Sequence, residues 1–333
     1  MLFSMFHPMF FFTLILGVLI SISSPTWLTA WIGLELNLLS FIPIITMKNN
    51  SFSSEASLKY FLIQALGSAT IIASASLMLL SSLNMNLLIE TSLLLKMGAA
   101  PFHFWFPQVM EGLDWLSAII LMTIQKIAPM VLISYTLMNS FNQNYLMIFA
   151  LLSSLIGAIG GINQTMLRKI LAFSSINHMS WMLLSMSFSE LYWSYYFILY
   201  CFISSSIALL FLIQQAFHVS HLSSYSLNPL LKIIALISLL SLGGLPPFIG
   251  FFPKWLIIQQ LVVELQYIPL VIMLLATLVT LYFYLRISIS SLTLHSLKPA
   301  WYTPTSLSMK TFPPLMLLFN LLFLMIIPSM LYF

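Results

Sequence analysis

The sequence predicts an all-α polytopic membrane protein with about eleven transmembrane helices. Of its 333 residues, 61% are hydrophobic and only 5% are charged, whereas about a quarter of the residues in a soluble domain are charged. Apolar stretches of about 20 residues, the length that spans a bilayer, recur along the whole chain. No polar stretch is long enough to form an extramembrane domain, so a soluble globular fold is excluded.

The predicted spans follow one another through short connections that carry Ser, Asn or Pro. We expect the spans at 4–23, 26–46, 58–82, 88–106, 115–138, 145–162, 168–187, 191–217, 229–266, 268–290 and 312–332. The first span directly follows Met1 without a basic leader, so it is interpreted as a span and not as a signal peptide. The polar segments 48–57, 139–144 and 291–310 are predicted to be connections.

The fourth and ninth spans share a Gly/Pro pattern. KMGAAPFHFWFP at 96–107 and LGGLPPFIGFFP at 242–253 align at an offset of 146 residues. The predicted helix breaks are Gly98, Pro101, Gly244, Pro246 and Pro247. Broken helices at corresponding places in two halves are typical of transporters built from repeats. The copies lie five spans apart, and an odd offset gives them opposite orientations. The alternative is that Gly and Pro only kink two helices for packing.

The charges differ between alternate connections. One side is expected to hold the basic residues Lys48, Lys59, Arg168, Lys169, Lys232, Arg286, Lys298 and Lys310, with the acidic residues Glu55, Glu111 and Asp114. The other side is expected to hold only Glu90, Glu190 and Glu264. Because Lys and Arg concentrate on the inner side of membrane proteins, the N-terminus is predicted on the basic side and the C-terminus on the opposite side.

Four ionisable side chains are predicted near the bilayer centre, namely Glu35, Lys96, Lys126 and Lys254. Each buried charge costs about 3 kcal/mol on insertion scales, so such residues are functional candidates by default. A lysine in a low-dielectric site can release its proton near neutral pH, which an arginine cannot do. Glu35 and Lys96 form the candidate pair whose approach and separation would change proton affinity. Pro129 would loosen the helix beside Lys126. Purely structural ion pairing is the alternative.

His178 is also predicted near mid-depth, with Ser174, Ser175 and Asn177 nearby in the sequence. A proton-relay role and an ordinary hydrogen-bonding role both remain open for this histidine. His218 and His221 have helical spacing but no third ligand, so no metal site is predicted.

The sequence predicts no cofactor site. The single cysteine, Cys201, excludes an internal disulfide and a cysteine-bound cluster. The GAIGG segment at 157–161 follows no strand and is interpreted as a helix-packing motif rather than a nucleotide-binding loop. Nothing in the sequence indicates a site for a nicotinamide, a flavin or an iron–sulfur cluster.

Taken in order, six motifs resemble those of the antiporter-like subunits in the membrane arm of respiratory complex I. They are WIGLELNLLSFIP, EASLKYFLIQA, KMGAAPFHFWFP, TIQKIAP, LRKILAFSSINHMSW and LGGLPPFIGFFPKW. The resemblance is strongest to the short animal forms and runs from about residue 10 to the C-terminus. It implies one membrane domain, 1–333, with inverted five-helix repeats at 1–140 and 141–291 and a connection and final helix at 292–333.

The resemblance also implies a function. Glu35, Lys96, Lys126 and Lys254 match the proton-channel residues of that family, and His178 matches a histidine common in it. NADH, FMN, iron–sulfur clusters and ubiquinone would be bound by other subunits, and this chain would hold no cofactor or metal. The expected partners are other antiporter-like, small and accessory membrane subunits together with lipids, and no nucleic acid. The expected location is the inner mitochondrial membrane, with the N-terminus in the matrix and the C-terminus in the intermembrane space.

Two rival functions remain open. An autonomous cation/proton antiporter should show a carboxylate-rich ion site, and Glu35 is the only carboxylate that is predicted to lie deep. In a non-conducting structural subunit, the buried charges would only hold helices together, and neutral replacement of the lysines would leave proton movement intact.

Overall fold

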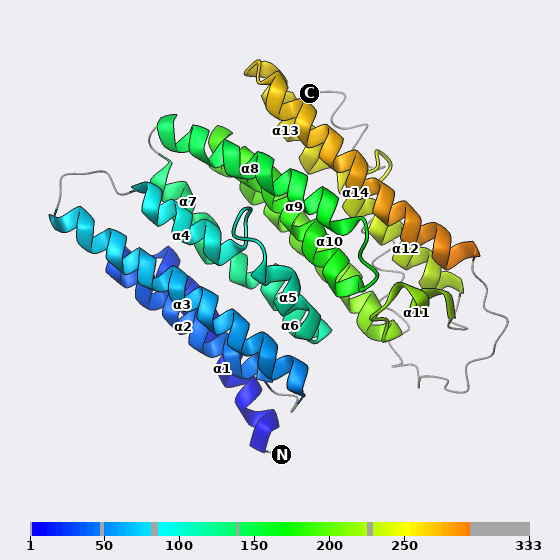
Figure 1. Ribbon diagram of the computed structural model, residues 1–333, viewed down its shortest axis with the longest axis horizontal. Helices are drawn as coiled ribbons and strands as arrows, with labels where there is room; N and C mark the ends of the chain where they lie inside the picture. Colours follow the sequence, from blue (N-terminus) through cyan, green and yellow to red (C-terminus); the bar gives the residue numbers. More distant parts are fainter. Residues whose placement is uncertain (1, 47–49, 81–85, 138–139, 225–228, 294–333) are drawn as a thin grey trace. The chain divides into compact units, whose positions relative to one another are not determined.

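A computed structural model describes residues 2–46, 50–80, 86–137, 140–224 and 229–293 (Figure 1). Apart from one isolated bridge between Met166 and His218, this part of the chain contains no extended pairing. Its helices are α1 (Leu2–Ile22), α2 (Trp27–Thr46), α3 (Ser51–Leu80), α4 (Asn86–Met97), α5 (Trp105–Gly112), α6 (Trp115–Met122), α7 (Ile124–Thr136), α8 (Ser140–Gly161), α9 (Leu167–Phe188), α10 (Glu190–Gln214), α11 (Val219–Ser224), α12 (Pro229–Gly243), α13 (Phe251–Val263) and α14 (Tyr267–Thr293).

The chain divides into two compact units, Met1–Ser153 (unit 1) and Ser154–Phe333 (unit 2). In unit 1, α2 packs between α1 and α3, α3 contacts α4 and α5, and α7 contacts α1, α4 and α6. In unit 2, α10 contacts α9, α12 and α13, while α14 contacts α9, α11, α12 and α13. The repeat boundaries and their inversion stay predictions.

Six helical stretches in the described residues are long and apolar enough to cross a membrane. They are Trp27–Thr46, Ser51–Met78, Trp115–Thr136, Asn142–Gly161, Glu190–Gln214 and Tyr267–Ser290. Large apolar side chains cover their outer faces, for example Leu278 and Ile159, which are 61% and 66% exposed. Such surfaces suit lipid rather than water, and the chain is a multi-pass membrane protein. The predicted span 312–332 lies outside the described residues, and the total of eleven stays a prediction.

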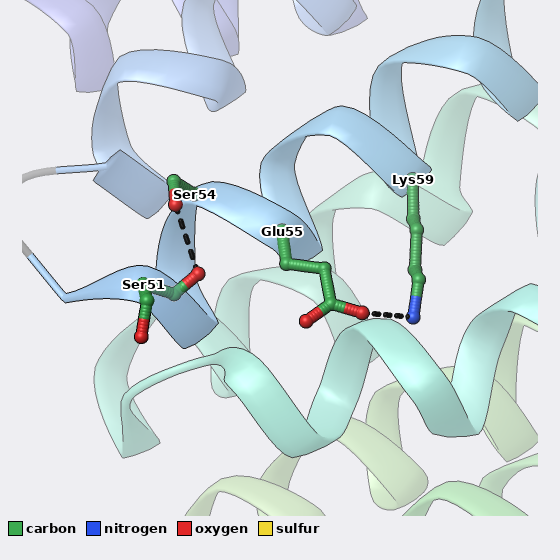
Figure 2. A network of polar contacts seen from close by, with 4 residues as sticks. All are labelled: Ser51, Ser54, Glu55 and Lys59. Atoms are coloured by element: carbon green, nitrogen blue, oxygen red, sulfur yellow. Dashed lines mark hydrogen bonds and ion pairs between the residues drawn. The ribbon is translucent and has the colours of Figure 1, made fainter.

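Three segments predicted as polar connections are partly helical, because α3 begins at Ser51, α8 begins at Ser140 and α14 ends at Thr293. Figure 2 shows the start of α3, where the Glu55 carboxylate and the Lys59 ammonium lie 2.6 Å apart and Ser54 Oγ donates to the Ser51 carbonyl. Pairs of opposite charge four residues apart stabilise exposed helices. Polar residues therefore continue this helix, although their composition suggests a loop.

The segment 157–161 packs helices together, as predicted. A Cβ at Gly157 would lie 2.8 Å from the Asn177 backbone nitrogen and 2.9 Å from the Phe173 carbonyl oxygen, both on α9. A Cβ at Gly161 would lie 2.8 Å from the ring of Phe283 on α14. The missing side chains thus allow α8 to approach both helices closely.

Helices α1 and α2 meet at a second pair of glycines, Gly17 and Gly33. A Cβ at Gly33 would lie 2.6 Å from the Ser21 nitrogen and 2.7 Å from the Gly17 oxygen. Because both are backbone atoms that cannot turn aside, we expect Gly33→Ala to destabilise the protein by about 1–3 kcal/mol. Thermal unfolding of the assembled protein measures this loss. Leu28→Ala, on the same helix at a side chain that is 66% exposed, is the control and should change little.

Candidate functional site

The first helix break lies between α4 and α5, where Gly98 ends α4. The backbone N–H of Gly98 donates to the Leu95 carbonyl at 3.1 Å, and that of Ala99 donates to the Leu94 carbonyl at 3.1 Å. Gly98 has a φ of 74°, in the left-handed region that favours glycine. These two bonds and the glycine make a Schellman motif. It stops α4 at Met97, one residue after Lys96, inside unit 1.

Lys96 is held in the last turn of α4 and is only 6% exposed. Gln64 Nε2 donates to the Lys96 carbonyl at 3.0 Å, and Trp105 Nε1 donates to the Leu95 carbonyl at 3.1 Å. Gln64 satisfies a carbonyl that the helix end leaves open, and Trp105 adds a second donor to the Leu95 carbonyl. A Cβ at Gly67 would lie 3.0 Å from Lys96 Cγ, so this glycine leaves room for the lysine stem.

Lys126 lies just after a second interruption in unit 1. The predicted span 115–138 divides at Thr123, which has a φ of −114° and a ψ of −80° between α6 and α7. Pro129 lies within α7, and the helix continues through it. The break therefore lies before Lys126 and not at the proline. Because Pro129 has no N–H and its ring crowds the carbonyl of Gln125, four residues earlier, the disturbance falls in the preceding turn.

Lys96 and Lys126 line the same small cavity. The cavity has about 20 Å³ of space for the centre of a water molecule, and one water needs about 10–15 Å³. Asn37 Oδ1 and Gln125 Nε2 belong to residues that also line it, and neither atom has a hydrogen-bond partner in the described part of the chain. One is an acceptor and the other a donor, so the cavity fits one hydrogen-bonded water.

Further contacts order the walls of this cavity. Tyr60 OH donates to Gln125 Oε1 at 3.2 Å, which orients the amide beside Lys126. The Lys126 ammonium lies 5.1 Å from the ring centroid of Phe106, within the range of a cation–π interaction. Lys126 is 2% exposed. The cavity is thus lined partly by apolar side chains and partly by polar and cationic ones.

Sequence reasoning did not select Asn37, Tyr60, Gln64 or Gln125. A signal was available, because each is a polar side chain within a predicted span or directly beside a selected lysine. Tyr60 and Gln64 are also four residues apart, which places them on one helix face.

Glu35, on α2, is partly buried, and its Oε2 atom has no hydrogen-bond partner in the described residues. Its charge acts on Lys96. However, no ion pair within 4.0 Å joins the two side chains in the described structure. The structure thus brings this predicted pair into electrostatic range with the two groups separated.

The second helix break, in unit 2, has the same backbone pattern as the first. Gly244 has a φ of 80°, its N–H donates to the Ser241 carbonyl at 3.0 Å, and the Leu245 N–H donates to the Leu240 carbonyl at 3.4 Å. These bonds correspond to those at Gly98 when the sequence is shifted by 146 residues. The sequence pattern therefore repeats as a repeated backbone geometry.

Lys254 reaches back from α13 to the end of α12. Its ammonium donates to the Gly243 carbonyl at 2.8 Å, and the side chain is 5% exposed. A Cβ at Gly244 would lie 3.0 Å from Lys254 Nζ. Lys96 and Lys254 flank their glycines on opposite sides in the sequence, yet both occupy a helix C-terminus. Carbonyls and the helix dipole favour a cation there.

His178 is buried on α9 in unit 2. Its Nδ1 lies 2.9 Å from Tyr196 OH, and its ring centroid lies 5.2 Å from that of Tyr200. The adjacent Asn177 Nδ2 donates to Thr280 Oγ1 at 3.5 Å. His178 is therefore ordered by tyrosine hydroxyls and rings, an arrangement that fits either of the two roles considered above.

The position of Glu90 differs from the one expected from the distribution of charged residues along the sequence. The sequence assigns it to one side of the membrane, at the edge of the predicted span 88–106, but its side chain is 0% exposed inside the bundle. Glu35 is therefore not the only carboxylate inside the helix bundle, whereas its place near the bilayer centre stays a prediction. Burial begins early in this helix, because α4 starts at Asn86 and Glu90 lies only four residues later. A single charge near a predicted span boundary does not reveal this.

The chain is similar to proteins of one family. The family model described as "NADH:quinone oxidoreductase/Mrp antiporter, TM" matches residues 24–280. NADH-ubiquinone oxidoreductase chain 2 of Anopheles gambiae is 51% identical over 305 residues, which are 89% of this chain and 88% of that protein. The same-named protein of Aedes aegypti is 50% identical over 312 residues, 91% of this chain and 90% of that protein.

A chain of respiratory complex I from Thermus thermophilus with bound Aureothin has a similar fold. The TM-score is 0.81 at 24% sequence identity, and the match covers 94% of this chain and 75% of that chain.

Proposed function

The chain belongs to the NADH-ubiquinone oxidoreductase chain 2 family, whose transmembrane domain is of the NADH:quinone oxidoreductase/Mrp antiporter type, and we propose that it translocates protons through buried Glu and Lys side chains. It is a membrane-arm subunit related to Mrp antiporters. NADH oxidation and ubiquinone reduction take place in other subunits, which hold the FMN and the iron–sulfur clusters. The protons cross the inner mitochondrial membrane, with the N-terminus of the chain in the matrix and its C-terminus in the intermembrane space.

The observation that carries this proposal is the cavity shared by Lys96 and Lys126. Two ammonium groups on different helices line one space of about 20 Å³. They disfavour each other's charge, so a proton that arrives on one favours release from the other. A water in the cavity would accept a proton from the Lys96 ammonium and donate one to the neutral Lys126 amine.

Glu35 is the group that drives the first step. When its carboxylate approaches Lys96, it stabilises the ammonium and holds the proton there. When it moves away, the ammonium loses that stabilisation and releases the proton toward Lys126. The present separation of the two side chains corresponds to the releasing arrangement. Energy from the redox subunits would shift this pair, and moving one charge against 100 mV costs about 2.3 kcal/mol.

In unit 2, Lys254 is the last station of the relay. Its bond to the Gly243 carbonyl stabilises the ammonium form, and loss of that bond would assist release of the proton. His178, next to its tyrosine cluster, takes part as an additional relay group. The relay thus consists of Glu35, Lys96, Lys126 and Lys254, with His178 as a further member.

Two alternatives make different predictions. An autonomous cation/proton antiporter would migrate as a small particle without redox activity, and Glu90 gives it a buried carboxylate besides the partly buried Glu35. A non-conducting structural subunit would keep full proton movement after its lysines are neutralised. Native gel migration in mild detergent, combined with rotenone-sensitive NADH–quinone activity, separates the first alternative from a complex subunit.

Replacing Lys96 with Met tests the proposed function directly. Met is an apolar side chain of similar length that cannot carry a proton, so we expect proton movement to be lost while the complex still assembles. The measurement is proton uptake per NADH oxidised in sealed membrane vesicles. Lys59→Met is the matched control, because Lys59 lies in an ion pair with 40% of its side chain exposed. Normal proton movement in the Lys96 variant would contradict the relay and favour the structural alternative.

A further inference from the structure

Helices α4 and α7 lie side by side (Figure 1). Polar side chains lie at both ends of their contact. At one end, Lys96 in the last turn of α4 and Lys126 in the first turn of α7 line the cavity described above. At the other end, Glu90, near the start of α4, faces Thr136, the last residue of α7. The two helices therefore run antiparallel, with lysines at one end and a carboxyl group at the other.

Among the described residues, no cationic side chain pairs with the Glu90 carboxyl group. It is 0% exposed, and neither of its oxygens has a hydrogen-bond partner in the described part of the chain. The side chains of Thr136 and Asn142 face it. Thr136 Oγ1 already donates to the Ile133 carbonyl at 2.8 Å, and Asn142 Nδ2 donates to the Thr136 carbonyl at 3.0 Å. These neighbours make the surroundings polar without neutralising a charge.

Such surroundings suit a carboxyl group that gains and loses a proton. An ionised carboxylate that is buried without a cation is very unfavourable, whereas the neutral acid is tolerated where polar groups lie close. A glutamate used only for packing gains nothing over an apolar residue at this place. Glu90 lies six residues before Lys96, which is about 9 Å along the helix axis. Water or movement of a lysine side chain must therefore connect the two ends.

Tyr145 is a partly exposed residue within electrostatic range of Glu90. It lies on α8, three residues after Asn142, and the charge of Glu90 acts on its phenol. Tyr145 is only partly buried, whereas Asn142 is 4% exposed. A buried carboxyl group with a partly exposed hydroxyl nearby forms a route by which a proton can leave the helix bundle.

We propose that Glu90 is a proton-binding site of unit 1, and that it exchanges its proton with the surface past Asn142 and Tyr145. In this exchange the O–H bond of the neutral carboxyl group breaks, and a water molecule accepts the proton. The site rests on the proposed function, because it deepens the proton route of the same unit. Unit 1 would then exchange protons with its surface at the Glu90 end of the α4–α7 contact, which is the end opposite the lysine cavity.

The test compares Glu90→Gln, Glu90→Asp and Glu190→Gln in the assembled complex within sealed vesicles. Gln keeps the shape of Glu but cannot ionise, and Asp keeps the carboxyl chemistry. Glu190 is an exposed glutamate and serves as the control for the same substitution. We expect loss of proton uptake per NADH oxidised in Glu90→Gln, recovery in Glu90→Asp and no change in Glu190→Gln. Unchanged proton uptake in Glu90→Gln overturns the proposal.

If the Glu90→Gln variant does not assemble, a second measurement on Glu90→Asp still tests the proposal. Infrared difference spectra during turnover report the carbonyl stretch of a protonated carboxyl group, and Glu90→Asp should shift one such band. The absence of any shifted band overturns the proposal. Proton uptake that depends on sodium in wild type but not in the Glu90 variant also overturns it, because the site would then bind a metal cation.

The Lys96→Met variant separates this inference from the proposed function. If Lys96→Met stops proton movement and Glu90→Gln does not, the relay stands and the Glu90 site is rejected. If neither substitution changes proton movement, both proposals are rejected.

Discussion

Replacing Lys126 with Met is expected to abolish proton movement through the chain while the complex still assembles. Lys126 is 2% exposed and lines the cavity that it shares with Lys96. Removal of a positioned proton-transfer group typically lowers a rate by about 10²-fold or more. Exchange of a buried charge for an apolar side chain of similar volume is often neutral for stability. The measurement is proton uptake per NADH oxidised, with the amount of assembled complex determined on a native gel.

Replacing Lys126 with Arg is the informative control. Arginine keeps the positive charge and can still interact with the Phe106 ring, but it does not release its proton in a protein. We therefore expect the Arg variant to be as inactive as the Met variant. Full activity with Arg would mean that the charge alone matters, and it would favour the structural alternative over the relay.

Replacing Gly250 with Ala is expected to prevent accumulation of the assembled protein. A Cβ at Gly250 would overlap the carbonyl oxygen of Ser241 and lie 2.8 Å from its carbonyl carbon. These are backbone atoms of α12, so the two halves of the broken helix must move apart. Overpacking of this kind costs about 1–3 kcal/mol or more. The shift would also separate Lys254 from the Gly243 carbonyl, and the amount of complex on a native gel measures the loss.

Gly67→Ala is the matched control for this substitution. Its Cβ would lie 3.0 Å from Lys96 Cγ, and a flexible lysine stem can give way where a backbone carbonyl cannot. We expect the Gly67 variant to assemble at close to the normal level. Equal assembly of the two variants would show that the approach between the halves of the broken helix is not needed for stability.

The predicted spans and the two breaks illustrate how far local patterns reach. Apolar runs of the length of a bilayer predict helices directly, because a membrane leaves the backbone no other way to satisfy its hydrogen bonds. Glycine and proline at 98–101 and 244–247 predict where those helices stop, since glycine accepts the left-handed conformation that each cap requires. The polar composition of 51–57 suggested a connection, but these residues belong to α3, where Glu55 and Lys59 form an ion pair.

Local patterns did not predict the burial of Glu90 or the helix break at Thr123. Whether a charge near a span boundary points to the outside or into the bundle depends on which helices cover it, and α7 and α8 approach Glu90 from more than 40 residues away in the sequence. The break at Thr123 lies six residues before Pro129, and neither a glycine nor a proline marks it in the sequence. Neither can be deduced from residue type and local spacing.

The sequence by itself determined the membrane class, the glycine caps and the identity of the buried lysines, because each follows from residue chemistry over a few turns of helix. Only the tertiary structure decided that Lys96 and Lys126 share one water-sized cavity with Asn37 and Gln125. It also decided that Glu90 is buried and that its carboxyl oxygens have no hydrogen-bond partner in the described part of the chain. The physical reason is that cavities and neutralisation of buried charge depend on contacts between helices that are distant in the chain, and local periodicity carries no information about those contacts.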